Sequence, residues 1–372
     1  MAFDAKVSIA LITYNQEQFV GRTIESILNQ SYQNFELIIG DDCSTDSTLE
    51  VISSYKDERI KLHKTDFNIG INGNLNPLVA NAKGDYIVFL AGDDKLRQNY
   101  LATIVKYFKE MPDIDVLYQQ LCPIDKNDNY IHTNDTYHAF TPKRSLEENL
   151  HLAFMQHNIF CSPAMALRKR VVDTIFPLPY SLVNFQDYAM HLDILINGFK
   201  VYVLDEILVD YRISGENISI NNDKYLIRED LEINFLMDYF LKIKDVKLLK
   251  RIFAKELDLL QPYADTIPFF LGQMSFLSHQ LKRREWGYRT IMEFLSKKKN
   301  FDIVHKRYNF TFKDYLNLVE KMRTPQNDKL LYFEAKCKKY KKRFNVLLSI
   351  TLTTLLAVFI IVLIFVNLGN LQ

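Results

Sequence analysis

The stretch Asp85-Tyr86-Ile87-Val88-Phe89-Leu90-Ala91-Gly92-Asp93-Asp94 decides how this sequence is organised. Its apolar run is short and closes on the small residues Ala91 and Gly92, which favours a buried strand over a helix. Two carboxylates follow at the carboxyl end, where open α/β sheets bind their ligands. Adjacent carboxylates repel each other and are costly to desolvate, so we expect a cation such as Mg²⁺ or Mn²⁺ beside them. The alternative is a solvated turn in which Asp94 caps the next helix.

Two earlier strands are also predicted to end in polar side chains. Val7 to Ile12 is followed by Thr13-Tyr14-Asn15, and Phe35 to Ile39 is followed by Asp41-Asp42, with a helical stripe over Phe19 to Gln30 between them. Strands that alternate with helices at this spacing indicate βαβ units and a mostly parallel sheet. We therefore expect an α/β fold in which three strand ends line one edge.

Composition narrows the class of protein. The 372 residues allow two compact units, and a formal net charge of +1 gives no argument for a nucleic-acid partner. The four cysteines, Cys43, Cys122, Cys161 and Cys337, lie far apart without C-x-x-C spacing. This usage is typical of a reducing compartment and not of a disulfide framework or a zinc site.

The C-terminal stretch predicts a membrane anchor. Val346 to Val366 is nearly all apolar, and 21 residues at ~1.5 Å each span roughly one hydrocarbon core. Six basic side chains within 336–343 precede it, and no charged side chain follows. By the positive-inside bias, we expect a single-pass protein at the cytoplasmic face of the cell membrane with its N-terminus cytoplasmic. A buried core helix is the alternative.

The N-terminal residues resemble the family-2 glycosyltransferases of the GT-A fold. The resemblance is carried by the opening Val7-Ser8-Ile9 with Thr13-Tyr14-Asn15, by Ser26 to Tyr32, by Asp41-Asp42-Cys43-Ser44-Thr45-Asp46 and by the strand leading to Asp93-Asp94. It covers roughly the first 110 residues. It implies a Rossmann-like mixed, mostly parallel sheet flanked by helices.

The resemblance also implies roles for individual residues. The residues placed at the nucleotide are Thr13, Tyr14, Asn15, Glu17, Asp42 and Asp93. Asp94, with Asp93, would hold the divalent metal, Mn²⁺ or Mg²⁺. No glycine-rich phosphate loop follows the first strand, and a metal held by acids at strand ends is the other way to bind a diphosphate.

A separate carboxylate, Asp187, is the candidate catalytic base. Taken alone, it would be the N-cap of the helix Met190 to Asn197, but the resemblance places Gln186-Asp187 at the position of the general base. The two roles are compatible. An Asp with an ordinary pKa near 3.9 is ionised at pH 7 and can accept the proton of an acceptor hydroxyl.

Three residues are weaker candidates for the diphosphate or the acceptor: Ser162, Arg212 and Ser214. Ser214 stands where many relatives carry a His that reaches the metal or diphosphate. Arg212 would either face the diphosphate or pair with a carboxylate. For Ser162 and its neighbour Arg168, the alternatives are a helix cap and a solvated charge.

The residues after 220 predict helices that the resemblance does not cover. The apolar stripe Leu231, Phe235, Leu236, Tyr239 and Phe240 indicates ordinary packing, with a homo-oligomer contact as the alternative. The segment 280–283 is interpreted as an exposed helix face. The expected organisation is a glycosyltransferase domain over 1–220, a helical region over 221–343 with a basic juxtamembrane segment, and a transmembrane helix over 344–368.

The predicted activity is metal-dependent, inverting transfer of a hexosyl or N-acetylhexosaminyl group from a nucleotide sugar, with UDP favoured. The expected acceptor is a hydroxyl of a lipid-linked saccharide in surface polysaccharide assembly. A sugar nucleotidyltransferase is the first alternative, but it would need a glycine-rich, basic loop where Thr13 to Gln18 stands. An inactive membrane scaffold that binds nucleotide sugars is the second; the acids Asp42, Asp93, Asp94 and Asp187 argue against it.

Overall fold

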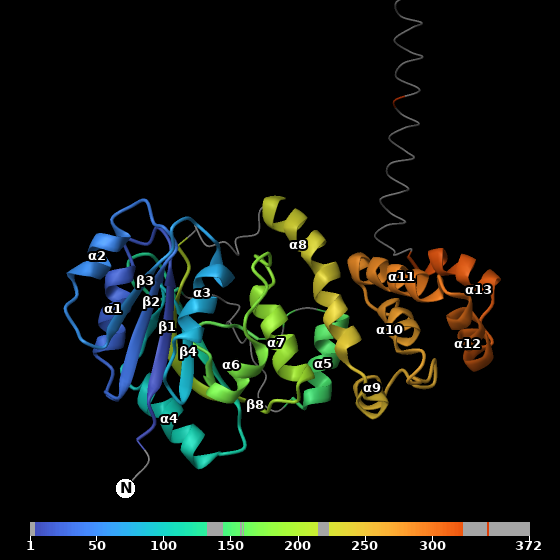
Figure 1. Cartoon of the computed structure of the whole chain (residues 1–372), viewed down its shortest axis with the longest axis horizontal. Coiled ribbons are helices and arrows are strands. Elements are labelled where there is room, and N and C mark those ends of the chain that lie inside the picture. The colour runs from blue at the N-terminus through green and yellow to red at the C-terminus, as the bar shows by residue number, and fades with distance from the viewer. Residues whose placement is uncertain are drawn as a thin grey trace, which may run out of the picture. The chain divides into compact units, whose positions relative to one another are not determined.

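The computed structural model describes residues 4–131, 144–156, 158, 160–214, 223–322 and 341. The chain forms two compact units, Met1–Phe310 and Thr311–Gln372. The first unit contains the whole sheet and most of the helices (Figure 1). It includes the predicted domain 1–220 and most of the predicted helical region.

A single eight-stranded sheet forms the centre of the first unit. Its strands are β1 (Val7–Thr13), β2 (Phe35–Asp41), β3 (Ile60–Lys64), β4 (Tyr86–Ala91), β5 (Lys95–Leu96), β6 (Val116–Ile124), β7 (Ala166–Arg168) and β8 (Val201–Arg212). Their order is β3-β2-β1-β4-β7-β6-β8-β5. The pairs within β3-β2-β1-β4 are parallel, as is β6 with β8, whereas β7 and β5 run antiparallel to their neighbours. The predicted mixed, mostly parallel sheet is confirmed.

The sheet is covered on both faces because successive side chains of its central strands point to opposite sides. One core contains Ile9, Leu37 and Val88 and is shared with the helices α1 (Val20–Leu28) and α4 (Tyr100–Glu110). The other contains Ala10, Ile38 and Ile87 and is shared with α3 (Ile71–Ala80), α6 (Lys169–Ile175) and α7 (Gln186–Ile196). Burial on both faces explains why these strands are continuous apolar runs in the sequence and not alternating ones.

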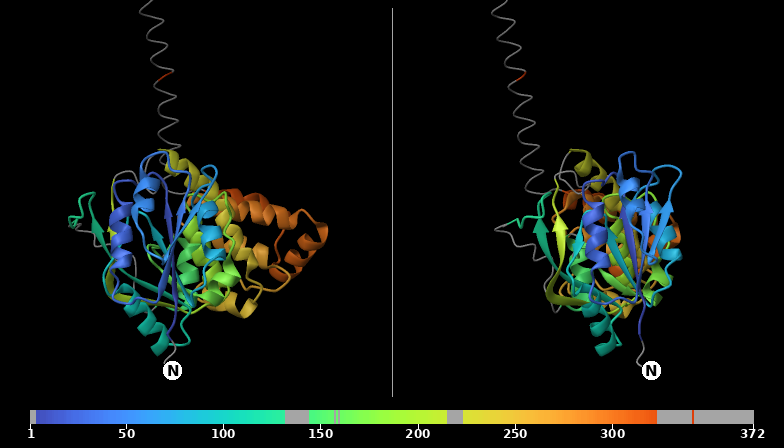
Figure 2. Two further views of the ribbon diagram at one scale, coloured as in Figure 1. Left: turned by 60° about the vertical axis from the view of Figure 1, so that its left-hand side comes forward. Right: turned by 90° about the vertical axis from the view of Figure 1, so that its left-hand side faces the viewer.

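Helices of the first unit are α1 (Val20–Leu28), α2 (Thr48–Ser54), α3 (Ile71–Ala80), α4 (Tyr100–Glu110), α5 (Leu146–Met155), α6 (Lys169–Ile175), α7 (Gln186–Ile196), α8 (Asp223–Met237), η1 (Asp238–Lys242), α9 (Val246–Ile252), α10 (Ile267–Ser275), α11 (Leu281–Leu295) and α12 (Lys298–Tyr308). The second unit holds α13 (Phe312–Asn317) and η2 (Leu318–Met322). Helices α10 to α12 lie beyond α5 and α7, on the side away from α1 and α2 (Figures 1 and 2).

The interpretation of residues 280–283 as an exposed helix face is wrong. Arg283 is fully buried, and its guanidinium donates to the carbonyls of Ala153, Phe154 and Gln156 at the end of α5. The last carbonyls of a helix have no partner within the helix, so an arginine from α11 supplies the missing donors. Trp286, one turn further on, is also buried.

The apolar stripe predicted around residue 235 is only partly a packing surface. Leu236, Tyr239 and Phe240 are buried, but Leu231 is 71% exposed and Phe235 46% exposed. Leu231 and Phe235 are four residues apart and share a face, while Leu236 lies about 100° further round the helix. Consequently Leu231 and Phe235 face solvent, whereas Leu236 faces the core.

Within the described ranges, which end at residue 322 apart from residue 341, no helix is both long and apolar enough to cross a bilayer. The predicted transmembrane helix over 344–368 lies outside the described residues.

Candidate active site

Six strands end at one edge of the sheet. β1, β2, β3, β4, β6 and β8 run in the same direction, so Thr13, Asp41, Lys64, Ala91, Ile124 and Arg212 lie along that edge. Three of these strand ends were predicted to meet. The ends of β6 and β8 join them because β7 is antiparallel to both β4 and β6, so β6 runs in the same direction as β4, and β8 is parallel to β6.

The loops after β1 and β2 are tied together by the side chains predicted to bind nucleotide. Asn15, which has a left-handed backbone, accepts the Thr45 N–H through Oδ1 at 2.8 Å. Glu17 accepts the Ser47 N–H at 2.8 Å. The carboxamide of Asn15 and the carboxylate of Glu17 thus hold the β2–α2 loop against the loop after β1. Tyr14, by contrast, is 45% exposed and can reach a ligand.

Asp42 anchors the loop that enters α3. Its two carboxylate oxygens accept the N–H groups of Ile69 and Gly70, each at 2.8 Å. Asp42 itself is buried. Its ordering of the loop 65–70 is an additional role beside the predicted contact with nucleotide, which stays a prediction.

Asp93 and Asp94 follow β4 at the centre of this edge. Asp94 is 1% exposed and accepts the backbone N–H of Arg212 at 2.9 Å. Burial raises the pKa of Asp94 well above its usual range, and the neighbouring charge of Asp93 raises it further. Burial also raises the pKa of Asp93. The short strand β5 follows directly, so Asp94 does not cap a helix, and that alternative is wrong.

The surroundings of this pair fit a divalent cation. In the described part of the chain, Thr13 Oγ1 and Gln16 Oε1 are buried without a hydrogen-bond partner. Both lie against Gly92, where an added Cβ would come within 2.3 Å of Gln16 Oε1. The same part of the chain holds no cluster of three or more His, Cys, Asp or Glu suited to a metal. A Mg²⁺ or Mn²⁺ ion here would therefore need oxygens of the diphosphate and water in addition to Asp94 and Asp93.

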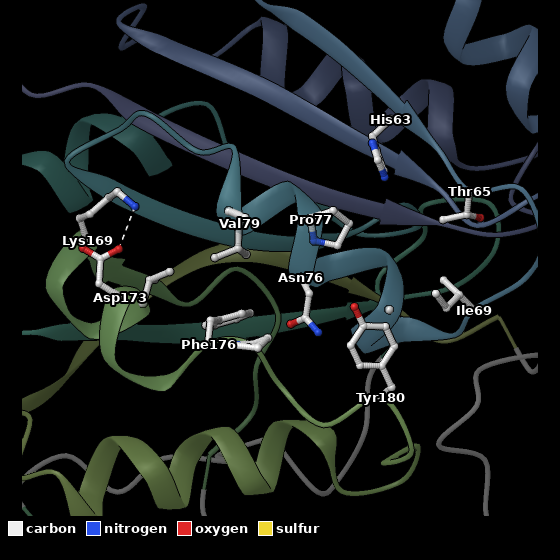
Figure 3. A pocket seen from close by; sticks show the side chains of 14 residues that line it. His63, Thr65, Ile69, Asn76, Pro77, Val79, Lys169, Asp173, Phe176 and Tyr180 are labelled. Atoms are coloured by element: carbon white, nitrogen blue, oxygen red, sulfur yellow. Dashed lines mark hydrogen bonds and ion pairs between the residues drawn. The ribbon is translucent and has the colours of Figure 1, made fainter.

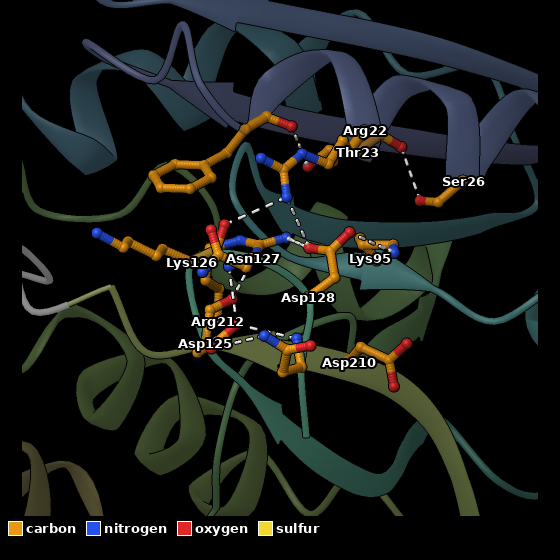
Figure 4. Close-up of polar contacts among 12 residues, drawn as sticks. Arg22, Thr23, Ser26, Lys95, Asp125, Lys126, Asn127, Asp128, Asp210 and Arg212 are labelled. Atoms are coloured by element: carbon orange, nitrogen blue, oxygen red, sulfur yellow. Dashed lines mark hydrogen bonds and ion pairs between the residues drawn. The ribbon is translucent and has the colours of Figure 1, made fainter. Parts of the chain in front are cut away.

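Arg212 clamps this turn to the loop after β6 (Figure 4). Its fully buried guanidinium donates to the Asp93 carbonyl at 2.8 Å and to the Asp125 carbonyl at 2.6 Å, and it pairs with Asp128 at 2.5 Å. The alternative that Arg212 pairs with a carboxylate is the one observed. Ser214, two residues on, is partly buried.

Asp128 is the centre of a cluster of three cations. It pairs with Arg22 at 3.1 Å and with Lys95 at 3.0 Å as well as with Arg212. Burial alone would raise the pKa of Asp128, but hydrogen bonds from Lys95 and Arg212 lower it to about 2. The cluster joins α1, β5 and β8 beside the acidic turn.

Replacing Asp128 with Asn should destabilise the protein by about 3 kcal/mol, because it leaves the buried Arg212 charge without its counter-ion. Urea unfolding, followed by circular dichroism, measures this free energy. Asp173→Asn is the matched control: its pair with Lys169 is exposed, so a loss below about 1 kcal/mol is expected. Equal losses in the two variants would contradict the clamp.

Asp187 lies in the first turn of α7 and not at its N-cap, so the N-cap prediction is wrong. The cap is Phe185, and Glu232 of α8 accepts the N–H groups of Val183, Asn184 and Phe185 at 2.9–3.1 Å. Glu232 thus orders the segment that leads into the helix, whereas the carboxylate of Asp187 contacts the first turn and a neighbouring loop. Asp187 accepts the Tyr188 N–H at 2.7 Å and Asn158 Nδ2 at 3.1 Å.

Burial raises the pKa of Asp187 to about 6, well above the 3.8 of an exposed Asp. Burial also raises the pKa of the Cys161 thiol, with further contributions from the charges of Asp187 and then Asp94. Both carboxylates are therefore close enough to act on one cysteine. Cys161 thus lies within electrostatic range of both the acidic turn and the candidate base, which are 93 residues apart in the chain.

Ser162 and His191 extend the contacts of Asp187. His191, which the sequence reasoning missed, bonds Asn158 Oδ1 through Nδ1 at 2.9 Å and Ser162 Oγ through Nε2 at 3.1 Å. Ser162 is thus not a helix cap. Arg168 is not a solvated charge either, because it donates to the carbonyls of Ile114 at 2.6 Å and Phe108 at 2.7 Å.

A groove of about 570 Å³ lies beside this edge, between α3 and α6 (Figure 3). Thr65 and Ile69, which belong to the loop held by Asp42, line one end of it, and Lys169 and Asp173 line the other. None of the predicted site residues lines the groove. The candidate carboxylates Asp93, Asp94 and Asp187 therefore lie outside this groove.

Residues 8–176 match the sequence model of a family described as "Glycosyl transferase family 2". The chain is 30% identical to an uncharacterised glycosyltransferase of Methanocaldococcus jannaschii, over 60% of this chain and 73% of that protein. It is 32% identical to UDP-Glc:alpha-D-GlcNAc-diphosphoundecaprenol beta-1,3-glucosyltransferase WfaP of Escherichia coli, over 60% of this chain and 83% of that protein. The crystal structure of S. aureus TarS 1-349 in complex with UDP-GlcNAc has the same fold, with a TM-score of 0.56, 18% identity, and coverage of 82% of this chain and 91% of that one.

Proposed function

This chain belongs to glycosyltransferase family 2 and is a glycosyltransferase, and we propose that it transfers a sugar from a UDP-sugar to a hydroxyl of a lipid-linked saccharide with inversion at the anomeric carbon. The observation that carries the proposal is the convergence of two kinds of carboxylate. Asp94 is buried and Asp93 partly buried in the turn after β4, and Asp187, on α7, and Asp94 both act electrostatically on Cys161. Metal binding and proton removal therefore fall to separate groups.

The acidic turn is the proposed place of the donor's diphosphate. Two adjacent buried carboxylates destabilise each other, and a divalent cation shared with the diphosphate relieves that repulsion. When bound, such an ion would stabilise the negative charge that grows on the departing UDP. Arg212 holds the turn in place through the Asp93 carbonyl and its own N–H to Asp94, so its role here is to position the acids.

Asp187 is the proposed general base. Displacement at an anomeric carbon requires the acceptor hydroxyl to lose its proton as the new bond forms, since a neutral alcohol is a poor nucleophile. In a single inverting step, that hydroxyl attacks from the side opposite the departing diphosphate. A carboxylate on α7, outside the metal pair, can serve that side.

The acceptor class rests on the similarity to WfaP, whose name specifies a diphosphoundecaprenol-linked acceptor and UDP-Glc. The basic residues within 336–343 and the apolar run Val346 to Val366 support an enzyme anchored at the cytoplasmic face of a membrane, where such acceptors are reached. Assembly through the helical region into a homo-oligomer remains an alternative arrangement of the same enzyme.

The test is release of free nucleotide from a panel of UDP-, GDP- and dTDP-sugars, with and without undecaprenyl-diphosphate saccharide in detergent. We expect UDP release that depends on the acceptor and a product with inverted anomeric configuration, measured by NMR. Formation of the nucleoside triphosphate and sugar 1-phosphate from a nucleotide sugar and added pyrophosphate would identify a nucleotidyltransferase instead. Binding of UDP-sugar without turnover under any acceptor would favour the inactive scaffold.

Transfer should depend on pH in the way the pKa of Asp187 dictates. The base form is the carboxylate, so kcat/KM should fall as the pH drops through about 6 and level off above it. An Asp with an ordinary pKa would keep full activity down to about pH 5. A profile that stays flat from pH 8 to pH 5 would contradict this assignment.

A further inference from the structure

Asp187 is joined to a buried histidine through one amide side chain. Asn158 donates from Nδ2 to Asp187 at 3.1 Å, and its Oδ1 bonds His191 Nδ1 at 2.9 Å. His191 lies four residues after Asp187 on α7, on the same face of the helix. The other ring nitrogen bonds Ser162 Oγ at 3.1 Å.

The imidazole is held in a closed apolar setting. His191 is 1% exposed, and the rings of Tyr118 and Phe160 meet it edge-on at 5.6 Å and 5.4 Å. Burial lowers the pKa of His191 to about 3, so the ring is neutral at any working pH. A neutral imidazole has one N–H donor and one acceptor nitrogen.

With Asp187 ionised, counting donors and acceptors favours one arrangement, in which Ser162, which also lies within reach of Asp187, gives its single proton to His191. An ionised Asp187 only accepts, so the amide of Asn158 must turn Nδ2 towards it and Oδ1 towards His191. Oδ1 needs a donor, which assigns the single ring proton to Nδ1. Nε2 is then the acceptor, and the Ser162 hydroxyl donates to it. The orientation of the amide and the tautomer of the ring are fixed by each other.

We propose that His191 is a positioning residue for the transfer reaction: it locks the amide of Asn158 so that a donor, and not a carbonyl oxygen, always faces the base Asp187. The inference rests on the proposed role of Asp187 as general base. Without the His191 donor, the amide can rotate and present Oδ1 to the carboxylate, which would repel the charged form. His191 thereby keeps Asp187 ionised and aimed in a site that otherwise favours its neutral form.

Other groups also act on Asp187. Ser162 lies within hydrogen-bond reach of its carboxylate and lowers its pKa. Tyr118 of β6, Tyr188 of α7, Tyr225 of α8 and Cys161 before β7 each interact with its charge, and burial raises the pKa of each. They are therefore uncharged near neutral pH. Arg283 of α11 reaches Tyr188 Oη at 3.3 Å, and the charge of Asp94 acts on Cys161.

The experiment compares the pH dependence of kcat/KM in His191→Phe and His191→Gln. Phenylalanine keeps a planar ring but has no donor. The fall of kcat/KM at low pH, here called the acid limb, should therefore move from about pH 6 to higher pH by about one unit, with near wild-type transfer at pH 8.5. Glutamine can donate to Asn158 and accept from Ser162, so its acid limb should stay close to that of the wild type. Binding of UDP, measured by calorimetry, should be unchanged in both.

His151→Phe is the matched control. This histidine also lies against an aromatic ring, Phe253, but its hydrogen-bond partner is Glu256, and neither of these residues belongs to the site. Its acid limb should not move. If His191→Phe fails to fold, His191→Met decides, because its flexible apolar side chain fills the same space without a donor and should move the limb in the same direction.

The outcomes separate the inference from the function on which it rests. An acid limb that is unmoved in His191→Phe or, where that variant does not fold, in His191→Met would overturn the positioning role, even if transfer falls equally at every pH. Near wild-type transfer by Asp187→Asn would instead overturn the proposed base, whatever the His191 variants do. An acid limb that is shifted in His191→Phe but close to that of the wild type in His191→Gln would support the inference.

Discussion

Replacing Asp94 with Asn should reduce sugar transfer by at least ~10³-fold while making the protein slightly more stable. The loss follows from the charge stabilisation of several kcal/mol that a metal ion supplies to a departing phosphate, since each 1.4 kcal/mol is tenfold in rate. The gain in stability follows from the sign of the pKa shift. The folded protein holds the pKa of Asp94 above its unfolded value, so ionisation at pH 7 costs stability, and a neutral amide removes that cost.

The two expected effects have opposite signs, because transfer falls while stability rises, and this distinguishes them from simple misfolding. A merely misfolded variant would lose activity and melting temperature together, whereas this one should lose only activity. Mn²⁺ with UDP should raise the Tm of the wild type and leave that of Asp94→Asn unchanged, because only a ligand bound to the folded state stabilises it. Asp113→Asn, at an exposed carboxylate, is the control and should behave as wild type. Full transfer in excess EDTA would rule the metal out.

The GT-A-like sheet was predictable because its signal is local. The strand over residues 86–90 is buried on both faces, so it is a continuous apolar run, and its carboxylates follow within four residues. The same reasoning located the ends of β1 and β2. Their positions at one edge follow from the parallel pairing that βαβ spacing implies.

The Arg212 clamp was not predictable because its parts are far apart. Asp128 and Arg212 are separated by 84 residues, and the pairing of β6 with β8 that joins them has irregular register around Gln120. Alternation of apolar residues does not reveal such register shifts. From the sequence alone, Arg212 could therefore serve the diphosphate or a carboxylate with equal reason.

The contacts of His191 and Asp187 were missed for a different reason. A single His on an apolar helix indicates an ordinary core residue, and its partners Asn158 and Ser162 lie on a separate loop. The N-cap error at Asp187 has a similar cause: the chain before α7 is held by Glu232 from α8, 45 residues downstream, and this places the N-cap at Phe185. Burial then raised a pKa that the sequence alone could only place near its ordinary value.

Replacing Asp187 with Asn should lower transfer by ~10² to 10⁴-fold, the usual loss for a general base, with folding and UDP binding close to normal. Asparagine has nearly the same shape and can still accept the Tyr188 N–H through Oδ1. It cannot take a proton from the acceptor. The transfer rate is measured by an endpoint assay, UDP binding by calorimetry and folding by the melting temperature.

Glu232→Gln is the matched control, because this carboxylate lies beside the same helix start and has a purely structural set of contacts. It accepts three backbone N–H groups, so its replacement should cost about 1 to 3 kcal/mol of stability and leave the acid limb near pH 6 in place. Asp187→Asn should show the reverse: little change in stability and no remaining acid limb. If Asp187→Asn transferred sugar at the wild-type rate with the limb still near pH 6, the proton would be taken by another group, and Asp187 would only order the start of α7.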